Sequence, residues 1–238
     1  EDYAKGRRDL DGKVFGEELA RIGWVGDEKV GARKMHAMLE LHIEQGPVLN
    51  EMDLPLGIVT SINGGVRYLC EVIGMASHAG TTPMNRRRDA LSAVAELSLY
   101  IEQRAARDGD SVGTIGICTV PGGATDVVPG RCQFALDLRA PNDPQRDAMV
   151  TDVLAELAKI CERRGLRHTT EVTMRAAAAP SAPEWQQRWE RAVDALGVPQ
   201  YRMPSGAGHD AMKLHEVMPQ AMLFVRGQNA GISHNPLE

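Results

Sequence analysis

Four short glycine-flanked segments of the sequence contain a histidine, the side chain best suited to bind a metal ion or to transfer a proton near neutral pH. These residues are His42, His78, His209 and His234. His42 follows an apolar run at residues 38–41 and precedes a Gly-Pro pair, a pattern typical of a buried strand that ends in a turn. One such histidine is more often a hydrogen-bonded core residue. Four such loops in one chain indicate an assembled site.

The chemistry open to these histidines differs from loop to loop. His42 and His234 both follow apolar segments, on either side of a long central region. Two neutral imidazoles suit zinc, manganese, cobalt or nickel, but a catalytic metal site needs at least three protein ligands, and the sequence offers no clear third one. The alternative for His234 is a turn residue ahead of Pro236. His78 either donates a hydrogen bond to a developing oxyanion or caps its own loop.

Arg139 is the candidate residue for binding an anionic ligand. In the strand expected at residues 131–139, apolar side chains alternate with polar ones, so the apolar side chains face one way and Arg139 faces the other. A guanidinium on an open sheet face can bind a carboxylate through two parallel hydrogen bonds. The alternative is an ordinary surface arginine. Gly208 and His209 fit either a tight turn with an N-cap or a loop that contacts substrate.

The elements that position these residues are clearest in the central region. Period-two and period-3.6 patterns predict the order β-α-β-β-α-β, which is typical of a ferredoxin-like sandwich with two helices on one face of the sheet. A cap at Asn142, followed by Pro144, marks the start of the second helix. The expected strands are residues 66–72, 112–120, 131–139 and 168–174, and the expected helices are 90–101 and 142–160.

Two composition changes predict the domain boundaries. Asn63-Gly64-Gly65 reads as a hinge, and the small, proline-containing stretch 176–183 reads as a linker. We therefore expect an inserted α+β domain at residues 64–175 within an α/β domain formed by residues 1–63 and 176–238. The elements expected in the flanks are helices at 14–22 and 183–196, one or two helical turns at 48–52, and strands at 38–41, 56–62 and 221–225.

Composition narrows the class of protein. The 238 residues are 43% hydrophobic with a net charge of −5, which suits buried cores and does not suit a nucleic-acid partner. No apolar stretch approaches the roughly 20 residues that span a bilayer, so we expect a cytoplasmic protein without a membrane partner. The first residue, Glu1, suggests part of a longer chain. Four cysteines without metal-type spacing are expected to be reduced core thiols: Cys70, Cys118, Cys132 and Cys161.

Six segments together resemble one enzyme family. The segments are residues 42–47, 74–91, 127–130, 137–139, 205–211 and 231–236. In their order and spacing they are similar to the N-carbamoyl-L-amino-acid hydrolases, β-ureidopropionases and allantoate amidohydrolases. These are dinuclear-metal amidohydrolases related to the aminoacylase and peptidase T type metallopeptidases. The resemblance implies an α/β catalytic domain, incomplete in this chain, with an inserted ferredoxin-like lid and dimerisation domain.

The resemblance also implies roles for individual residues. His42 and His234 would each bind one of two divalent ions, zinc, manganese, cobalt or nickel. His78 would stabilise the transition state in the active site of the other subunit of a homodimer, which it reaches from the inserted domain. The remaining positions would contact substrate, with the arginine holding its carboxylate: Gln45, Asp126, Arg139, Gly208 and His209.

The implied reaction is metal-dependent cleavage of the ureido C–N bond of N-carbamoyl-L-amino acids or allantoate, which releases ammonia and carbon dioxide. The sequence departs from the family pattern at Asp126, where members commonly have Asn. The family's first metal histidine, its bridging aspartate and its pair of glutamates belong before Glu1, so this chain by itself is expected to be inactive. The alternatives are a non-catalytic dimerisation or small-molecule-binding module and a metallopeptidase of the same superfamily.

Overall fold

The structure is a computed structural model that describes residues 5–9, 11–29, 32–231 and 233–234. The chain forms two compact units, residues 1–37 and residues 38–238. The first unit contains helix α2 (Phe15–Arg21), which confirms the predicted helix to within one residue at each end and has no buried residue. The second unit contains all the predicted site residues.

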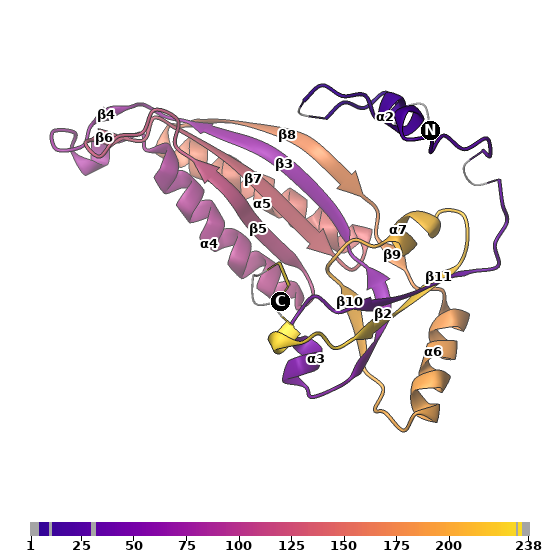
Figure 1. The fold of residues 1–238 in the computed structure, drawn as a ribbon. Helices are drawn as coiled ribbons and strands as arrows, with labels where there is room; N and C mark the ends of the chain where they lie inside the picture. The colour runs from indigo at the N-terminus through magenta and orange to yellow at the C-terminus, as the bar shows by residue number, and fades with distance from the viewer. Residues whose placement is uncertain (1–4, 10, 30–31, 232, 235–238) are drawn as a thin grey trace. The chain divides into compact units, whose positions relative to one another are not determined.

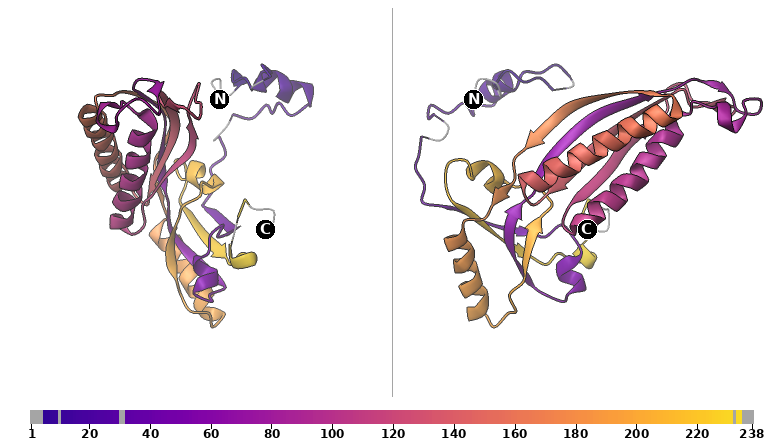
Figure 2. Two further views of the ribbon diagram at one scale, coloured as in Figure 1. Left: turned by 90° about the vertical axis from the view of Figure 1, so that its left-hand side faces the viewer. Right: turned by 180° about the vertical axis from the view of Figure 1, so that it is seen from behind.

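A sheet of four antiparallel strands forms the central region of the second unit, in the order β5-β7-β3-β8 (Figure 1). Helices α4 (Ala90–Asp108) and α5 (Asp143–Arg164) cover one face of this sheet, as Figure 2 shows. All six predicted elements are therefore present, and most are longer than predicted. The strands are β3 (Gly64–Ile73), β5 (Val112–Thr119), β7 (Arg131–Ala140) and β8 (Arg167–Ala176).

Capping side chains fix where the two helices begin. Asp89 accepts a hydrogen bond from the backbone N–H of Ser92 at 3.1 Å, and Asn142, the predicted cap, accepts one from Gln145 at 2.9 Å. Each bond satisfies one of the backbone donors that the first helical turn leaves without an internal partner. Gly165, at φ +64°, then ends α5 in the left-handed conformation that favours glycine.

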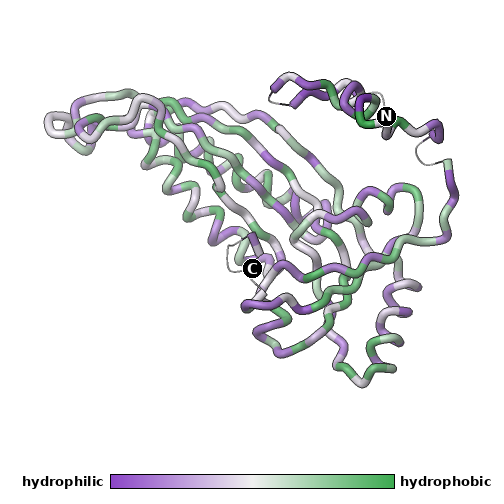
Figure 3. Tube along the Cα trace, in the orientation of Figure 1, coloured by the Kyte–Doolittle hydropathy of each residue, from purple (hydrophilic) through white to green (hydrophobic). Residues whose placement is uncertain are grey.

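The core lies between these helices and the sheet. Apolar side chains recur at helical spacing along α4 and α5 and at every second position along β3 and β7, which gives the alternating colours of Figure 3. Cys132, Phe134, Leu136 and Leu138 are buried, as predicted for that strand, so Arg139 lies on the face opposite the helices. Other buried members of this core are Val66, Val72, Val94, Leu97, Ile101, Met149, Val153, Leu157 and Ile160.

The prediction of four core thiols is wrong for one cysteine. Cys70, Cys132 and Cys161 are buried, whereas Cys118 is exposed. Cys118 lies near the end of the edge strand β5, beyond a register shift that follows Ile115, where the alternation between buried and exposed positions is lost. All four thiols are free.

A mixed sheet in the order β1-β11-β2-β10 forms the rest of the second unit, with β9 paired to β2. Strand β1 is parallel to β11, β11 is antiparallel to β2, and β2 is parallel to β10. The predicted strands and helices of the flanks are confirmed. The elements are β1 (Met38–Ile43), α3 (Val48–Glu51), β2 (Leu56–Ile62), β9 (Ala179–Pro180), α6 (Pro183–Ala195), β10 (Arg202–Ser205), α7 (Asp210–Leu214), β11 (Gln220–Val225) and the 3-10 turn η2 (Asn229–Gly231).

Three local expectations for the flanks need correction. Strand β1 is an edge strand with only one face covered, so Leu39 and Leu41 are exposed and the strand is not fully buried. The predicted linker 176–183 contains β9, which pairs with β2. Leu196, an expected inward residue of α6, is 70% exposed because it lies at the C-cap, beyond the last turn of the buried stripe.

The expected glycine hinge is part of a strand. Gly64 is the first residue of β3, and a side chain there would meet the Arg146 guanidinium and the Ala178 backbone nitrogen. Glycine is therefore needed at this position for close packing and does not break the strand. The domain boundaries predicted beside it, 63/64 and 175/176, remain predictions.

Two short strands extend the central region beyond β3. Strands β4 (Ser77–His78) and β6 (Val127–Val128) pair with each other, and the 3-10 turn η1 (Met84–Arg86) follows β4. They lie at the end of the four-stranded sheet farthest from the mixed sheet (Figures 1 and 2). Among the described residues, no helix has both the length and the apolar character needed to cross a membrane.

The helix–sheet core should dominate the stability of the second unit. Leu157 on α5 is fully buried, so Leu157→Ala should lower the free energy of unfolding by about 2–5 kcal/mol through lost burial and the cavity left behind. Leu99→Ala on α4, where the side chain is 63% exposed, is the matched control and should stay within about 0.5 kcal/mol. Chemical denaturation measures both, and equal effects would contradict this description of the core.

Candidate functional site

Three side chains that could bind one metal ion meet beside strand β1. Glu40 and His42 are two residues apart on β1 and so lie on the same face of the strand. His209, the residue before helix α7, lies next to both side chains. The potential ligand atoms of all three residues lie within 4.8 Å of one another. The rings of His42 and His209 are 4.6 Å apart between centroids, in an edge-on arrangement.

A hydrogen bond at one ring nitrogen of His42 leaves the other available to a metal ion. Its Nδ1 lies 2.8 Å from the backbone oxygen of Ile43, which can only accept a hydrogen bond. In the neutral ring the proton is therefore on Nδ1, and the lone pair of Nε2 is available. A backbone carbonyl on the second ring nitrogen is the usual way in which proteins orient a metal-binding histidine.

His209 is enclosed, with only 1% of its side chain exposed. Burial, followed by the proximity of His42, lowers the pKa of His209 below its ordinary value, although Glu40 and Asp210 oppose the shift. The neutral imidazole that results is the form that binds metals. Its Nε2 lies 2.8 Å from Ser205 Oγ, and its Nδ1 lies 3.7 Å from a carboxylate oxygen of Glu40.

Glu40 is the member of this cluster that the sequence prediction missed. Its second carboxylate oxygen accepts a hydrogen bond from the Ala211 N–H at 2.9 Å, which ties the first turn of α7 to β1. The available signal was its period-two spacing from His42, which places both side chains on one face of a strand. The partner on α7 could not be found in this way, because 171 residues separate Glu40 from Ala211.

Gln45 and His234 are joined through Ser233. The Gln45 amide donates to Ser233 Oγ at 3.3 Å, and Ser233 Oγ lies 2.9 Å from His234 Nδ1. Two predicted site residues at opposite ends of the sequence thus belong to one hydrogen-bonded chain. His234 is not part of the metal-binding cluster among the described residues, so its role as a ligand remains a prediction, and Asn235 and Pro236 lie outside those residues.

Two loops that contain these residues touch through their backbones. Gly231 has φ +70°, and a side chain there would collide with the carbonyl oxygen of Gly46. Glu44 holds the turn between β1 and α3. Its buried carboxylate accepts hydrogen bonds from the backbone N–H groups of Val48 and Leu49, both at 2.9 Å. Such a pair of bonds stabilises the start of helix α3.

Arg139 lies on the open face of the four-stranded sheet, and it contacts the loop before α7. Its Nε and Nη2 donate to the two carboxylate oxygens of Asp137 at 2.7 and 2.8 Å, and its Nη1 donates to the Gly206 carbonyl at 2.7 Å. The hydrogen bonds that Arg139 donates to Asp137 raise the pKa of Arg139 further above its ordinary value. Burial tends to raise the pKa of Asp137, but hydrogen bonds from Arg139 and then Arg67 hold that pKa below its usual range.

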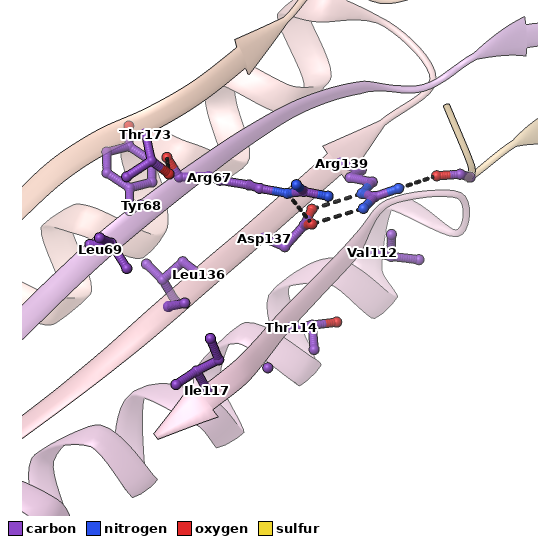
Figure 4. A pocket seen from close by; sticks show the side chains of 13 residues that line it. Arg67, Tyr68, Leu69, Val112, Thr114, Ile117, Leu136, Asp137, Arg139 and Thr173 are labelled. Atoms are coloured by element: carbon purple, nitrogen blue, oxygen red, sulfur yellow. Dashed lines mark hydrogen bonds and ion pairs between the residues drawn. The ribbon is translucent and has the colours of Figure 1, made fainter. Parts of the chain in front are cut away.

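A cavity of about 540 Å³ lies over this arginine (Figure 4). Its polar end is formed by Arg67, Asp137 and Arg139, and Gly206 contributes from the neighbouring loop. The rest of the lining includes the apolar side chains of Leu69 on β3 and Ile117 on β5. The cavity therefore combines a positively charged end with apolar walls, which suits a small ligand with one carboxylate.

His78 lies in the hairpin at the far end of the sheet, and Asp126 lies beside it. The backbone N–H groups of Gly80 and Thr81 donate to His78 Nδ1 at 3.0 and 3.3 Å. In the neutral ring the proton is therefore on Nε2, which can donate a hydrogen bond outward because His78 is exposed. The Ala79 N–H donates to the Asp126 backbone oxygen at 2.8 Å.

The predicted residues thus fall into two groups. Gln45, His42, His209 and His234 lie around the mixed sheet, with Gly208 in the exposed loop before His209 and Arg139 tied to the same loop. His78 and Asp126 lie at the opposite end of the four-stranded sheet (Figure 1). The donor set near His42, two imidazoles and a carboxylate, fits a divalent transition metal such as zinc or manganese.

Comparison with known proteins gives a consistent set of matches. The model of peptidase family M20/M25/M40 matches residues 12–238. The chain is 40% identical over 235 residues to an N-carbamoyl-L-amino acid amidohydrolase from Geobacillus stearothermophilus, covering 97% of this chain and 57% of the relative. It is 35% identical to an allantoate deiminase from Arabidopsis thaliana, covering 84% of this chain and 43% of that protein.

A solved structure agrees with these relatives. The chain superposes with a TM-score of 0.92 on a hydantoinase/carbamoylase family amidase from Burkholderia multivorans, at 37% identity. The match covers 100% of this chain and 58% of that one. The chain therefore spans between 43% and 58% of the length of these relatives.

Removal of the His42 imidazole should weaken metal binding. The affinity for Zn²⁺ can be measured by titrating metal-free protein in a calorimeter. His42→Ala should lower this affinity by at least about tenfold, because the substitution removes a ligand and not only a residue that supports one. His168→Ala is the matched control, since His168 is exposed on β8, away from the cluster. Unchanged affinity and stoichiometry in His42→Ala would contradict the assignment of His42.

Proposed function

The chain belongs to peptidase family M20/M25/M40, and from that premise we propose that the whole protein is a metal-dependent amidohydrolase that acts on the ureido C–N bond of N-carbamoyl-L-amino acids. The observation that supports this most is the cluster of Glu40, His42 and His209, with one ring nitrogen of His42 left available to a metal ion. Two relatives named as N-carbamoyl-L-amino-acid amidohydrolases are 40% and 38% identical to this chain. Allantoate is the second candidate substrate, because an allantoate deiminase is 35% identical.

We assign His42, with Glu40 and His209 beside it, to one of two divalent ions and His234 to the other. When bound, such ions would polarise the ureido carbonyl and lower the pKa of water. The Nδ1–H of His42 donates to Ile43 and so keeps the Nε2 lone pair directed at its ligand position. Gln45 supports His234 through Ser233, so a substrate contact at Gln45 would lie next to this second ligand.

Arg139 would bind the carboxylate of the substrate. Its guanidinium lies in the cavity of Figure 4 and is linked to the loop that contains Gly208 and His209. In this proposal that loop forms the wall of the substrate site, and Asp126 contributes from the distant hairpin. Both Asp126 and His78 must then reach the site from another subunit, because they lie at the far end of their own four-stranded sheet.

His78 would donate a hydrogen bond to the oxyanion that forms during hydrolysis. Its Nδ1 accepts two backbone hydrogen bonds, so the proton on Nε2 is directed away from its own loop. Residues 64–175 would form the inserted ferredoxin-like domain, which serves as lid and dimerisation domain. In a homodimer of this kind, each hairpin would complete the active site of the partner subunit.

The native protein should release ammonia from N-carbamoyl-L-alanine in a metal-dependent manner. His78→Ala should lower kcat by about 100- to 1000-fold, since it removes one oxyanion donor, while KM changes little. Coupled detection of ammonium measures the rate, with His168→Ala as the control. Release from allantoate but not from the carbamoyl amino acid would select the second substrate. No metal-dependent release from either compound would contradict the proposed function.

Mixed dimers test whether His78 acts across the subunit boundary. Two inactive variants, His78→Ala and His42→Ala, should restore about a quarter of the wild-type activity when unfolded and refolded together, because half of the dimers are mixed and each mixed dimer has one intact site. Each variant refolded alone is the control and should stay inactive. If the mixture remains as inactive as its components, His78 does not act in the partner's site.

A further inference from the structure

We propose that Asp137 is a positioning residue for substrate binding. It holds the Arg139 guanidinium so that one N–H of each terminal nitrogen faces the substrate carboxylate. This inference rests on the proposed function and extends it to a residue that does not itself contact the ligand. Asp137 and Arg139 are two residues apart on β7, so both side chains lie on the open face of the sheet, opposite the helices.

The contact between the two side chains is a two-pronged one. Arg139 Nε and Nη2 donate to different oxygens of Asp137, at 2.7 and 2.8 Å, and the dashed lines of Figure 4 show this pair. Two parallel charge-assisted bonds fix the plane of a guanidinium as well as its position. A single bond would allow the plane to rotate.

A third contact holds the other terminal nitrogen of the guanidinium. Arg139 Nη1 donates to the Gly206 carbonyl at 2.7 Å, so the group is held between a carboxylate on its own strand and a backbone oxygen of the loop before α7. These contacts account for three of the five N–H donors of Arg139, and no hydrogen bond from the other two is found among the described residues. Those two donors, one on each terminal nitrogen, suit a carboxylate that approaches end-on.

Arg67 holds Asp137 from the neighbouring strand. Arg67 lies directly opposite Asp137 in the pairing of β3 with β7, and its Nε donates to Asp137 Oδ2 at 2.8 Å. The carboxylate therefore lies between two guanidinium groups and cannot turn toward either one without losing a bond to the other. The three groups together have one net positive charge, which matches the single carboxylate of the proposed substrate.

The alternative reading of this network is a surface ion pair that only stabilises the sheet or adjusts the local charge. The two readings predict opposite effects on binding. Asp137→Asn makes the cavity more positive, so a role in charge alone predicts tighter binding of an anionic substrate. A positioning role predicts weaker binding, because the neutral amide offers one acceptor and breaks the two-pronged contact.

The test compares Asp137→Asn with wild type in the native, metal-loaded protein. For N-carbamoyl-L-alanine, KM should rise by about tenfold with kcat nearly unchanged, as expected when an interaction with a charged group is lost in ground state and transition state alike. For N-carbamoyl-L-alaninamide, which lacks the carboxylate, wild type and variant should have the same KM. Asp152→Asn is the matched control, because it removes an Arg104–Asp152 ion pair of the same domain on the helical side.

The remaining outcomes decide between the readings. A lower or unchanged KM for the carboxylate substrate in Asp137→Asn would overturn the proposal, as would a loss confined to kcat. Arg67→Gln leaves the contact between Asp137 and Arg139 in place, so its KM should rise by less than that of Asp137→Asn. An effect as large as that of Asp137→Asn would overturn the assignment of Asp137 as the principal positioning residue.

A crystal structure of Asp137→Asn separates this proposal from the proposed function. If neither wild type nor variant hydrolyses any ureido compound, the proposed function fails, and the position of Arg139 still tests the inference. The guanidinium should then leave the Gly206 carbonyl, to which Nη1 donates at 2.7 Å in the wild-type protein. A guanidinium that keeps its place and its bond to Gly206 in the variant would overturn the positioning role.

Discussion

The parallel pairing of β1 with β11 is the interaction on which the candidate site depends. These strands pair without a break from Met38 opposite Gln220 to Ile43 opposite Val225. Because the strands run in the same direction, the turns that follow them emerge at the same edge of the sheet. The turn after β1 contains Gln45, and the segment after β11 contains Ser233 and His234. A hydrogen bond across 188 residues of sequence is the result.

Two of the links between the sheets of the second unit involve the loop of the candidate site. The chain passes directly from β2 through Asn63 into β3. The backbone N–H of Asn63 donates to Ser205 at 2.9 Å, and Arg139 donates to Gly206, the next residue along. The loop that contains His209 is therefore held from both sheets. Movement of one sheet relative to the other would change the surroundings of this histidine.

Much of the fold could be predicted because it depends on local patterns. The alternation from Cys132 to Leu138 identified the open face of β7 and hence the position of Arg139, and the cap at Asn142 located the start of α5. Features that depend on contacts distant in the sequence could not be predicted. The close packing at Gly64 is one of them, because its neighbours Arg146 and Ala178 follow much later in the chain.

The same limit applies to the candidate site. The histidine loops could be found by residue type. The contact between His209 and His42 could not be predicted, because it depends on how α7 packs on β1. The tautomers of His42 and His78 are likewise set by backbone atoms, an Ile43 carbonyl in one case and the Gly80 and Thr81 N–H groups in the other. Residue identity alone contains no information on these protons.

Gly231 limits which parts of this protein can change through amino-acid substitution during evolution. At that residue two main chains meet with no side chain between them, since a Cβ atom would collide with the Gly46 carbonyl. Where side chains lie between two segments, a different rotamer or residue can change the distance between them. Where main-chain atoms are in direct contact, that distance is set by the main-chain atoms themselves. Substitutions in the surrounding core therefore do not change the distance between these two turns. New substrate preferences can arise around Arg139 while the distance between the histidine-bearing loops stays constant.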